Sequence, residues 1–352
     1  MLLALIDLCV ESGHPPSVLT TPQLARRVVE LYWPQSRPFE TRPDQTDRRT
    51  LLQNRGGQAS VVRLISAYQQ AHPDELSPPR RGPAGYPPAY QALLDAVEWV
   101  LVEYPLPRLQ RVAGGEERFL YVIDWGEDVS KAAFLRYKQG AHLFADFDNR
   151  ILLQPDAAAS LIALSSVLRP LVQQQWQLWL QAQNQLPESA LTAFLFGAER
   201  AALGPVREPL RALQGGRCFY CTGPLSSGPT QVDHFLPWAR YPDNGLDNLV
   251  LAHDRCNHNK LHFLADQPYA ERWARRIQDQ GADLDAIAEL ARWPRDLDRT
   301  LGVVASTYQG LPTGVRLWQG VDRWRPLGDA DLEAVHGFGR GLLRALSARP
   351  LA

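Results

Sequence analysis

The chain has 352 residues, of which 45% are hydrophobic and 21% are charged, and its formal net charge is −1. This composition is typical of globular proteins and excludes a disordered, collagen-like or coiled-coil chain, while the length suggests two or three domains. Because the chain has no overall positive charge, any binding of nucleic acid must come from local basic patches or bound metal ions.

The chain shows no pattern of export or membrane insertion. The first 13 residues lack a basic start, and Asp7 and Glu11 interrupt their apolar run. The least charged long stretch, residues 161–185, contains Arg169, a proline and many glutamines, so it cannot span a bilayer. Four cysteines are too few for a disulfide framework. We therefore expect a cytoplasmic protein with no membrane partner.

Residues 1–110 are predicted to be mostly helical. A first helix is expected over residues 1–12, a second begins with Thr21 as N-cap and Pro22 at the first helical position, and a third lies near residues 58–70. Three short helices followed by a β-wing would suit a winged-helix module that binds DNA or a protein partner. The same pattern also suits any small helical bundle.

A run of arginines without an acid surrounds the start of the third helix. It is either a solvated loop and helix face or a set of phosphate contacts near a helix N-terminus. On the second interpretation the nucleic-acid-binding residues are Arg48, Arg49, Arg55 and Arg63.

The rest of the chain is also predicted to be rich in helices. Residues 77–88 form a proline- and glycine-rich connector, and residues 118–124 have the pattern of a buried strand. The expected fold class is α+β, predominantly helical. Its regions are residues 1–110, a mixed middle region 111–204, a small domain 205–265 and a helical C-terminal region 266–352. Further helices are expected at 89–103, 157–184 with a proline break, 188–199, 205–214, 268–281, 284–293, 296–307 and 330–346.

Two pairs of metal-binding residues stand out in the small domain. Cys218 and Cys221 form one pair, and His253 and Cys256 form the other. A two-residue gap lets a tight turn aim both side chains at one ion, so this pattern predicts a structural Zn²⁺. His258 or His262 could replace His253, and the cysteines could also be simple buried thiols.

Between and after the two pairs lies a set of residues suited to a second metal. Asp233 and His234 follow a short predicted strand, and residues 247–252 have the pattern of the second strand of a hairpin. A helix that opens with Cys256 and Asn257 follows. Carboxylate and amide oxygens suit Mg²⁺ or Mn²⁺, and a neighbouring imidazole can deprotonate water.

The ordered motifs CxxC, DHxxP, DNLVLA and CNxxK resemble the HNH endonuclease family, also called ββα-metal or His-Me finger nucleases, in its zinc-knuckle subgroup. The resemblance covers about residues 212–265 and implies a ββα-metal core between helical regions. It implies His234 as general base, Asp233 and Asn257 as ligands of Mg²⁺ or Mn²⁺, and Asn248 as the residue that steadies the loop and orients His234. Lys260 would lie near the phosphate or cap the surroundings of the helix. Many zinc-bearing members have cysteine where this chain has His253, which is also a competent zinc ligand.

Three functional hypotheses follow. The first is an HNH DNA endonuclease with its own DNA-binding N-terminal domain, by analogy a prokaryotic restriction or phage-defence effector. The second is an HNH effector subunit that a partner protein or complex activates. The third is a non-catalytic, zinc-stabilised scaffold that binds nucleic acid. One catalytic metal per site cuts one strand, so cutting a duplex would need a homodimer or sequential nicks.

Overall fold

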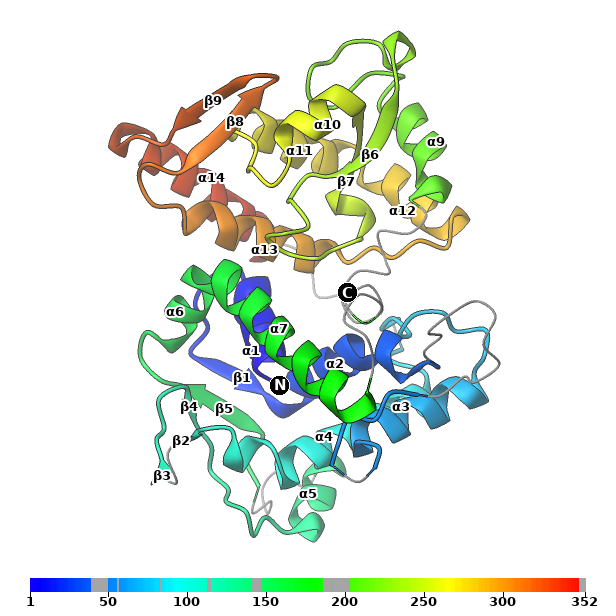
Figure 1. Ribbon diagram of the computed structural model, residues 1–352, viewed down its shortest axis with the longest axis vertical. Coiled ribbons are helices and arrows are strands. Elements are labelled where there is room, and N and C mark those ends of the chain that lie inside the picture. The colour runs from blue at the N-terminus through cyan, green and yellow to red at the C-terminus, as the bar shows by residue number, and fades with distance from the viewer. Residues whose placement is uncertain are drawn as a thin grey trace.

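The protein is described here by a computed structural model. Its described residues form two lobes, one made by the first half of the chain and one by the second (Figure 1). The described residues are 1–38, 50–55, 57–82, 84–112, 115–140, 147–185, 191 and 203–347. Within them, no helix combines the length and the apolar character needed to cross a bilayer.

The N-terminal lobe is built around α1, whose residues from Leu3 to Val10 are all buried. A helix that is apolar on nearly every side belongs in a core, because no face of it suits solvent. Helices α2 and α4 pack together beside it, and α6 and α7 cover it as well. The helices of this lobe are α1 (Leu2–Glu11), α2 (Thr21–Tyr32), α3 (Ser60–Ala71), α4 (Pro88–Glu103), α5 (Lys131–Lys138), α6 (Ala157–Ala163) and α7 (Ser165–Asn184), with short 3-10 turns at Pro34–Ser36 and Leu106–Arg108.

The N-terminal lobe also contains a small antiparallel sheet with the strand order β1-β5-β4. The strands are β1 (Val18–Thr20), β4 (Tyr121–Val122) and β5 (Arg150–Leu153), and a separate pair joins β2 (Arg111–Val112) to β3 (Gly115–Glu116). The winged-helix hypothesis expects three helices before the wing. Here α1, α2, α3 and α4 precede β4, and α5 lies between β4 and β5, so that hypothesis stays a prediction.

Three local predictions for this lobe differ from the structure. The N-cap of α2 is Thr20, because its backbone N–H donates to the Gln23 side chain at 2.9 Å. The predicted long helix breaks at Leu164, where α6 ends, whereas the proline at position 170 lies inside α7. The strand expected at 118–124 pairs only over β4. The helix predicted at 188–199 lies outside the described residues, apart from residue 191.

The C-terminal lobe holds the small domain between helices, and the α+β, predominantly helical fold class is confirmed. A hairpin, β8–β9, was missing from the sequence prediction. The elements are α9 (Gly204–Leu213), η6 (Leu225–Ser227), β6 (Thr230–His234), η7 (Leu246–Asn248), β7 (Leu249–His253), α10 (Asp254–Lys260), α11 (Gln267–Asp279), α12 (Gly281–Leu290), α13 (Leu297–Gln309), β8 (Arg316–Gly320), β9 (Arg323–Pro326) and α14 (Asp329–Ser347).

The two lobes meet where α1 packs against α13. A Cβ atom on Gly302 of α13 would lie 1.8 Å from the backbone oxygen of Glu11, so only glycine allows this approach. One turn further along α13, the Ser306 hydroxyl donates to the backbone oxygen of Val10 at 2.7 Å. The contact between the lobes is therefore close at the level of the backbone.

Candidate metal and nuclease site

The loop that carries Cys218 and Cys221 is a tight turn. The Cys218 N–H donates to the Gly223 oxygen at 2.9 Å, and the Thr222 N–H donates back to the Cys218 oxygen at 3.0 Å. Thr222 has a φ of 58°, the left-handed conformation that closes such a turn. The turn brings both thiols to one side of the loop, as the two-residue spacing predicts.

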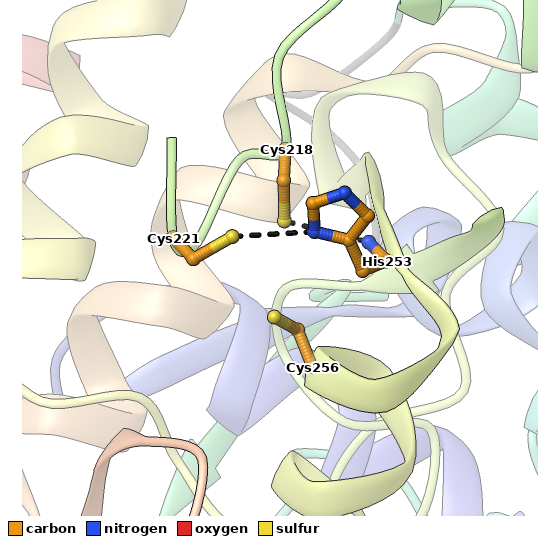
Figure 2. Close-up of side chains that lie close together, drawn as sticks. All are labelled: Cys218, Cys221, His253 and Cys256. Atoms are coloured by element: carbon orange, nitrogen blue, oxygen red, sulfur yellow. Dashed lines mark hydrogen bonds between the residues drawn. The ribbon is translucent and has the colours of Figure 1, made fainter. Parts of the chain in front are cut away.

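His253 and Cys256 approach these thiols from the other side, at the end of β7 and in the first turn of α10 (Figure 2). One ligand atom from each of the four residues lies within 4.8 Å of the others. The Cys221 Sγ and His253 Nδ1 atoms are 3.2 Å apart. Tetrahedral zinc with Zn–S bonds of about 2.3 Å holds sulfurs roughly 3.8 Å apart, so this donor set fits a Zn²⁺ ion.

The contacts of His253 Nε2 show that Nδ1 is the ring nitrogen that faces the thiols. Nε2 lies 3.0 Å from the backbone oxygen of Pro224 and 3.1 Å from the Ser227 hydroxyl. Because a carbonyl oxygen only accepts, Nε2 carries the proton and Nδ1 is the atom that can bind metal. His258 instead points to Asp254 at 3.0 Å and is exposed, so it does not join the cluster.

The contact between Cys218 and Cys256 favours the thiolate form of one of these two residues. A hydrogen bond with Cys256 lowers the pKa of Cys218 to about 5, and the same bond raises the pKa of Cys256. One thiolate is thus stable beside its neighbours at neutral pH. Zinc binds thiolates, so this is the protonation behaviour that its ligands need.

The hairpin behind the knuckle positions the second set of predicted residues. Strands β6 and β7 pair with Asp233 opposite Val250 and His234 opposite Leu249. Gln231 and Asp233 lie two residues apart and so share one face of β6, and α10 covers that face. Asn257 Nδ2 donates to Gln231 Oε1 at 2.7 Å.

Within the described residues, the contacts of Asp233 and Asn257 each leave one side-chain oxygen for a further ligand. Tyr220 donates to Asp233 Oδ2 at 2.5 Å, and the Lys260 ammonium lies 3.0 Å from the same atom. Both contacts engage Oδ2, which leaves Oδ1 of this carboxylate. In Asn257 the amide nitrogen is engaged, which leaves its Oδ1. A carboxylate and an amide oxygen on one face fit a hard cation such as Mg²⁺ or Mn²⁺.

His234 lies at the end of β6, on the opposite side of the strand from Asp233. Its Nε2 atom is 2.8 Å from the Asn244 side-chain oxygen. Because that oxygen only accepts, Nε2 carries the proton and Nδ1 can accept one. Burial lowers the pKa of His234, so the ring is neutral at neutral pH. The side chain can therefore act as a proton acceptor.

Comparison with known proteins agrees with this geometry. Residues 218–265 match the family model described as HNH endonuclease. This segment resembles the HNH endonuclease family, and it is called the HNH domain below. No curated protein and no solved structure matches the chain significantly. The match covers the knuckle, both strands and α10. The N-terminal lobe and the other helices of the C-terminal lobe lie outside it.

Within the HNH domain, Asn248 anchors the loop between the strands. Its side chain accepts from the Leu236 N–H at 2.8 Å and donates to the backbone oxygens of Leu236 at 3.2 Å and Asp243 at 3.1 Å. The sequence resemblance implied that Asn248 also orients His234. In the part of the chain that the structure describes, the hydrogen bond to the ring comes from Asn244, while Asn248 holds the loop that carries Asn244.

Lys260 lies inside the domain, beside Asp233 and His234. Its side chain is fully buried, and the ammonium lies against Asp233 and donates to the backbone oxygen of His234 at 2.9 Å. A buried ammonium must be paired, and this one pairs with the Asp233 carboxylate. The sequence pattern gives Lys260 a phosphate contact because the family motif does not show burial. In the structure Lys260 positions the end of β6.

The sequence analysis did not identify the residues that form hydrogen bonds with the predicted site residues. Tyr220, Asn244 and Gln231 each make a direct hydrogen bond to a predicted site residue. Tyr220 lies inside the CxxC spacing and Gln231 two positions before Asp233, so both could have been found by asking which neighbours share a face. Asn244 depends on the loop conformation, which no local signal in the sequence gives.

The arginine patch is only partly described. Arg55 and Arg63 are exposed, and an Arg63 guanidinium nitrogen donates to the Ser60 hydroxyl at 3.1 Å. Arg48 and Arg49 lie outside the described residues. The structure thus leaves the two described guanidinium groups accessible to a ligand, without identifying one.

Proposed function

We propose that the HNH domain hydrolyses phosphodiester bonds in DNA. The observation that carries this proposal is His234, a buried imidazole whose Nε2 proton is held by Asn244 and whose Nδ1 atom can accept a proton. The residue before it in the strand is the carboxylate Asp233. This pairing of a neutral base with a hard metal ligand suits attack of water on phosphorus.

In this proposal Asp233 and Asn257 hold Mg²⁺ or Mn²⁺ through the oxygens that their other contacts leave. Bound there, the ion would neutralise negative charge that develops on the phosphate and the leaving oxygen. Lys260 and Tyr220 keep the Asp233 carboxylate in one orientation. His234 takes the proton from the attacking water, a contribution of typically about 10²–10⁴-fold in rate.

The zinc knuckle has a structural part in this proposal. It fixes the chain on both sides of the hairpin, because Cys218 and Cys221 lie before β6 while His253 and Cys256 join β7 to α10. The residue between the first two ligands, Tyr220, reaches Asp233. Zinc therefore stabilises the segment that orients the first ligand of the catalytic metal.

For the whole protein we propose a cytoplasmic nuclease effector of restriction or phage defence, on contextual analogy. The close backbone contact between α1 and α13 joins the N-terminal lobe to the nuclease lobe. This contact favours the second candidate, an effector whose N-terminal lobe receives a protein partner or activating complex and passes the signal on. A homodimer would allow both strands of a duplex to be cut.

The deciding experiment is cleavage of supercoiled plasmid by the purified chain, with Mg²⁺ or Mn²⁺ and with EDTA. The proposal expects nicked circles first, only in the presence of the divalent ion, because one site cuts one strand. A parallel single-stranded RNA substrate tests the choice of DNA. Binding of DNA without cleavage under every condition would instead support the zinc scaffold.

Arg55 and Arg63 are proposed phosphate contacts, together with Arg48 and Arg49. Each lost phosphate contact should reduce the log–log slope of affinity against salt by about one unit. We expect Arg55→Ala and Arg63→Ala each to weaken DNA binding and flatten this slope. Arg136→Ala, which removes an exposed arginine of α5, serves as the control. If affinity and slope match the unmodified protein, this surface is solvated or binds protein.

A further inference from the structure

A cluster of buried charges lies where the two lobes meet. It contains three acids and three arginines from four helices, so its formal charges balance. Arg27 lies 2.6 Å from Asp7, 3.3 Å from Glu11 and 2.7 Å from Glu30. Asp7 is fully buried, and Arg27 is 7% exposed. The members are Asp7 and Glu11 of α1, Arg27 and Glu30 of α2, Arg169 of α7 and Arg299 of α13.

The cluster crosses from the N-terminal lobe into the nuclease lobe at two points. Arg299 of α13 lies 2.7 Å from Glu30 and 3.6 Å from Glu11. The second point is Tyr241, in the loop between β6 and β7 of the HNH domain. Its hydroxyl donates to Glu11 and accepts from Arg27 at 3.2 Å.

Tyr241 is bound from several directions at once. Its side chain is 2% exposed, and the Arg169 guanidinium lies 5.3 Å from the centre of its ring. The ring thus lies against the arginine of α7, while the hydroxyl bonds to Glu11 of α1 and to Arg27 of α2. The position of Tyr241 is therefore set by residues of the N-terminal lobe.

The same loop carries the residue that orients the catalytic base. Asn244 is three residues after Tyr241, and its side chain holds His234 Nε2 at 2.8 Å. Residues of the C-terminal region also bind this loop, one from the connection between α12 and α13 and one from α13. The Trp293 indole donates to the Asn244 backbone oxygen at 2.7 Å, and the Thr300 hydroxyl donates to Asp243 at 3.1 Å. The loop therefore lies between the two lobes and touches His234.

A buried charge cluster contributes little net stability, because removing charges from water costs nearly as much as their attraction returns. What such a cluster supplies is a defined geometry, since each group has a fixed set of partners. Here the geometry it defines includes the position of Tyr241. Fixing one end of the loop in this way restricts where Asn244 can present its oxygen to His234.

We infer that Tyr241 is a positioning residue, through which the N-terminal lobe holds Asn244 and so sets the proton position on His234. This inference rests on the proposed function, since it assigns His234 as the base. On this inference, the N-terminal lobe helps to orient the base of the nuclease site. A partner that disturbed the contact of α1 and α2 with Tyr241 would lower the reaction rate without touching substrate.

Tyr241→Phe tests the inference, because it removes one oxygen and keeps the ring against Arg169. We expect kcat for plasmid nicking to fall by about 10- to 100-fold, as for a small misplacement of a reacting group, with Kd for DNA unchanged. Tyr308→Phe is the matched control: this buried hydroxyl donates to the Ala265 backbone oxygen at 2.7 Å, outside the loop. It should leave kcat unchanged.

A double-mutant cycle shows whether Tyr241 acts through Asn244. Asn244→Ala should lower kcat at least as much as Tyr241→Phe, and the double variant should be no slower than Asn244→Ala alone, because coupled residues are not additive. Losses that multiply would overturn the inference. So would a Tyr241→Phe protein with the kcat of the unmodified chain.

A second readout needs no nuclease activity. In protein labelled with ¹⁵N-histidine and without added Mg²⁺, the His234 signal is the one that His234→Ala removes. We expect an Nε2-protonated ring in the unmodified protein and a mixture of tautomers in Tyr241→Phe and Asn244→Ala. An unchanged signal in Tyr241→Phe overturns the inference even if the chain cuts DNA. A shifted signal in a chain that never cuts DNA supports the positioning and rejects only the proposed nuclease function.

Discussion

His234→Ala is expected to lower metal-dependent plasmid nicking by about 10²–10⁴-fold, the usual contribution of a general base. The variant removes the proton acceptor and no ligand of either metal. The backbone oxygen of His234 remains, so Lys260 keeps its hydrogen bond to residue 234. Folding, zinc content and DNA affinity should therefore stay at the level of the unmodified protein, which circular dichroism, metal analysis and a binding titration can check.

The matched control for this prediction is His336→Ala. His336 lies on α14, outside the HNH domain, and its ring nitrogen bonds to the backbone oxygen of Leu311 at 3.1 Å. Its replacement removes an imidazole and one hydrogen bond, as His234→Ala does, but should leave the nicking rate unchanged. Full nicking by the His234→Ala protein would reject the mechanism and favour the scaffold hypothesis.

Asp233 is a less decisive position for the same test. Asp233→Ala would remove a proposed metal ligand and would also leave the buried Lys260 ammonium without its carboxylate. An unpaired buried charge typically costs about 3–5 kcal/mol. Loss of activity in that variant would mix an effect on the metal with an effect on folding. His234→Ala is therefore the cleaner test of the two.

The zinc cluster was predictable because its signal is local. Two pairs of ligands with two-residue gaps are visible in the sequence, and each gap requires only a tight turn to work. The choice of His253 over His258 also followed from spacing, and the structure places His253 in the cluster. The ββα order of the HNH domain could be predicted in the same way, from motifs that follow one another along the chain.

The charge cluster was not predictable because its members are far apart in sequence. Asp7 and Arg169 each drew attention as a charge that interrupts an apolar stretch. In the structure they are ion-pair partners, 162 residues apart. A pairing of this kind depends on how helices pack, and no local pattern encodes it. The sequence predicts a DNA- or partner-binding domain at the N-terminus, and it gives no sign that helices of this region contact the loop of the HNH domain.

The missed hairpin has a different cause. Leu317 and Trp318 of β8 are fully buried, while β9 is largely exposed and carries Arg323 and Arg325. Strands this short give little periodicity, and charged residues on an edge strand weaken the pattern further. The turn between the strands is nevertheless visible in the sequence, because Gly320 and Asp322 both adopt positive φ. Glycine and aspartate at these positions favour a hairpin turn.

Cys221→Ser is expected to release zinc and destabilise the HNH domain. Cys221 is the exposed member of the cluster, so the variant disturbs little packing of its own. Structural zinc contributes on the order of 10–16 kcal/mol in peptide models, far more than the loss of one exposed sulfur. Without the ion, the knuckle no longer fixes Tyr220 against Asp233. Nicking should be lost together with the cooperative unfolding of the nuclease lobe.

Metal analysis of the unmodified protein should give about one zinc per chain, because four ligands make one tetrahedral site. Cys9→Ala is the control: Cys9 is a buried thiol of α1 outside the cluster, so its variant can lose some stability but must keep zinc. A chelator should reproduce the effect of Cys221→Ser on thermal unfolding and have little further effect on that variant. A well-folded, zinc-free protein with the same unfolding temperature would contradict a structural role for zinc.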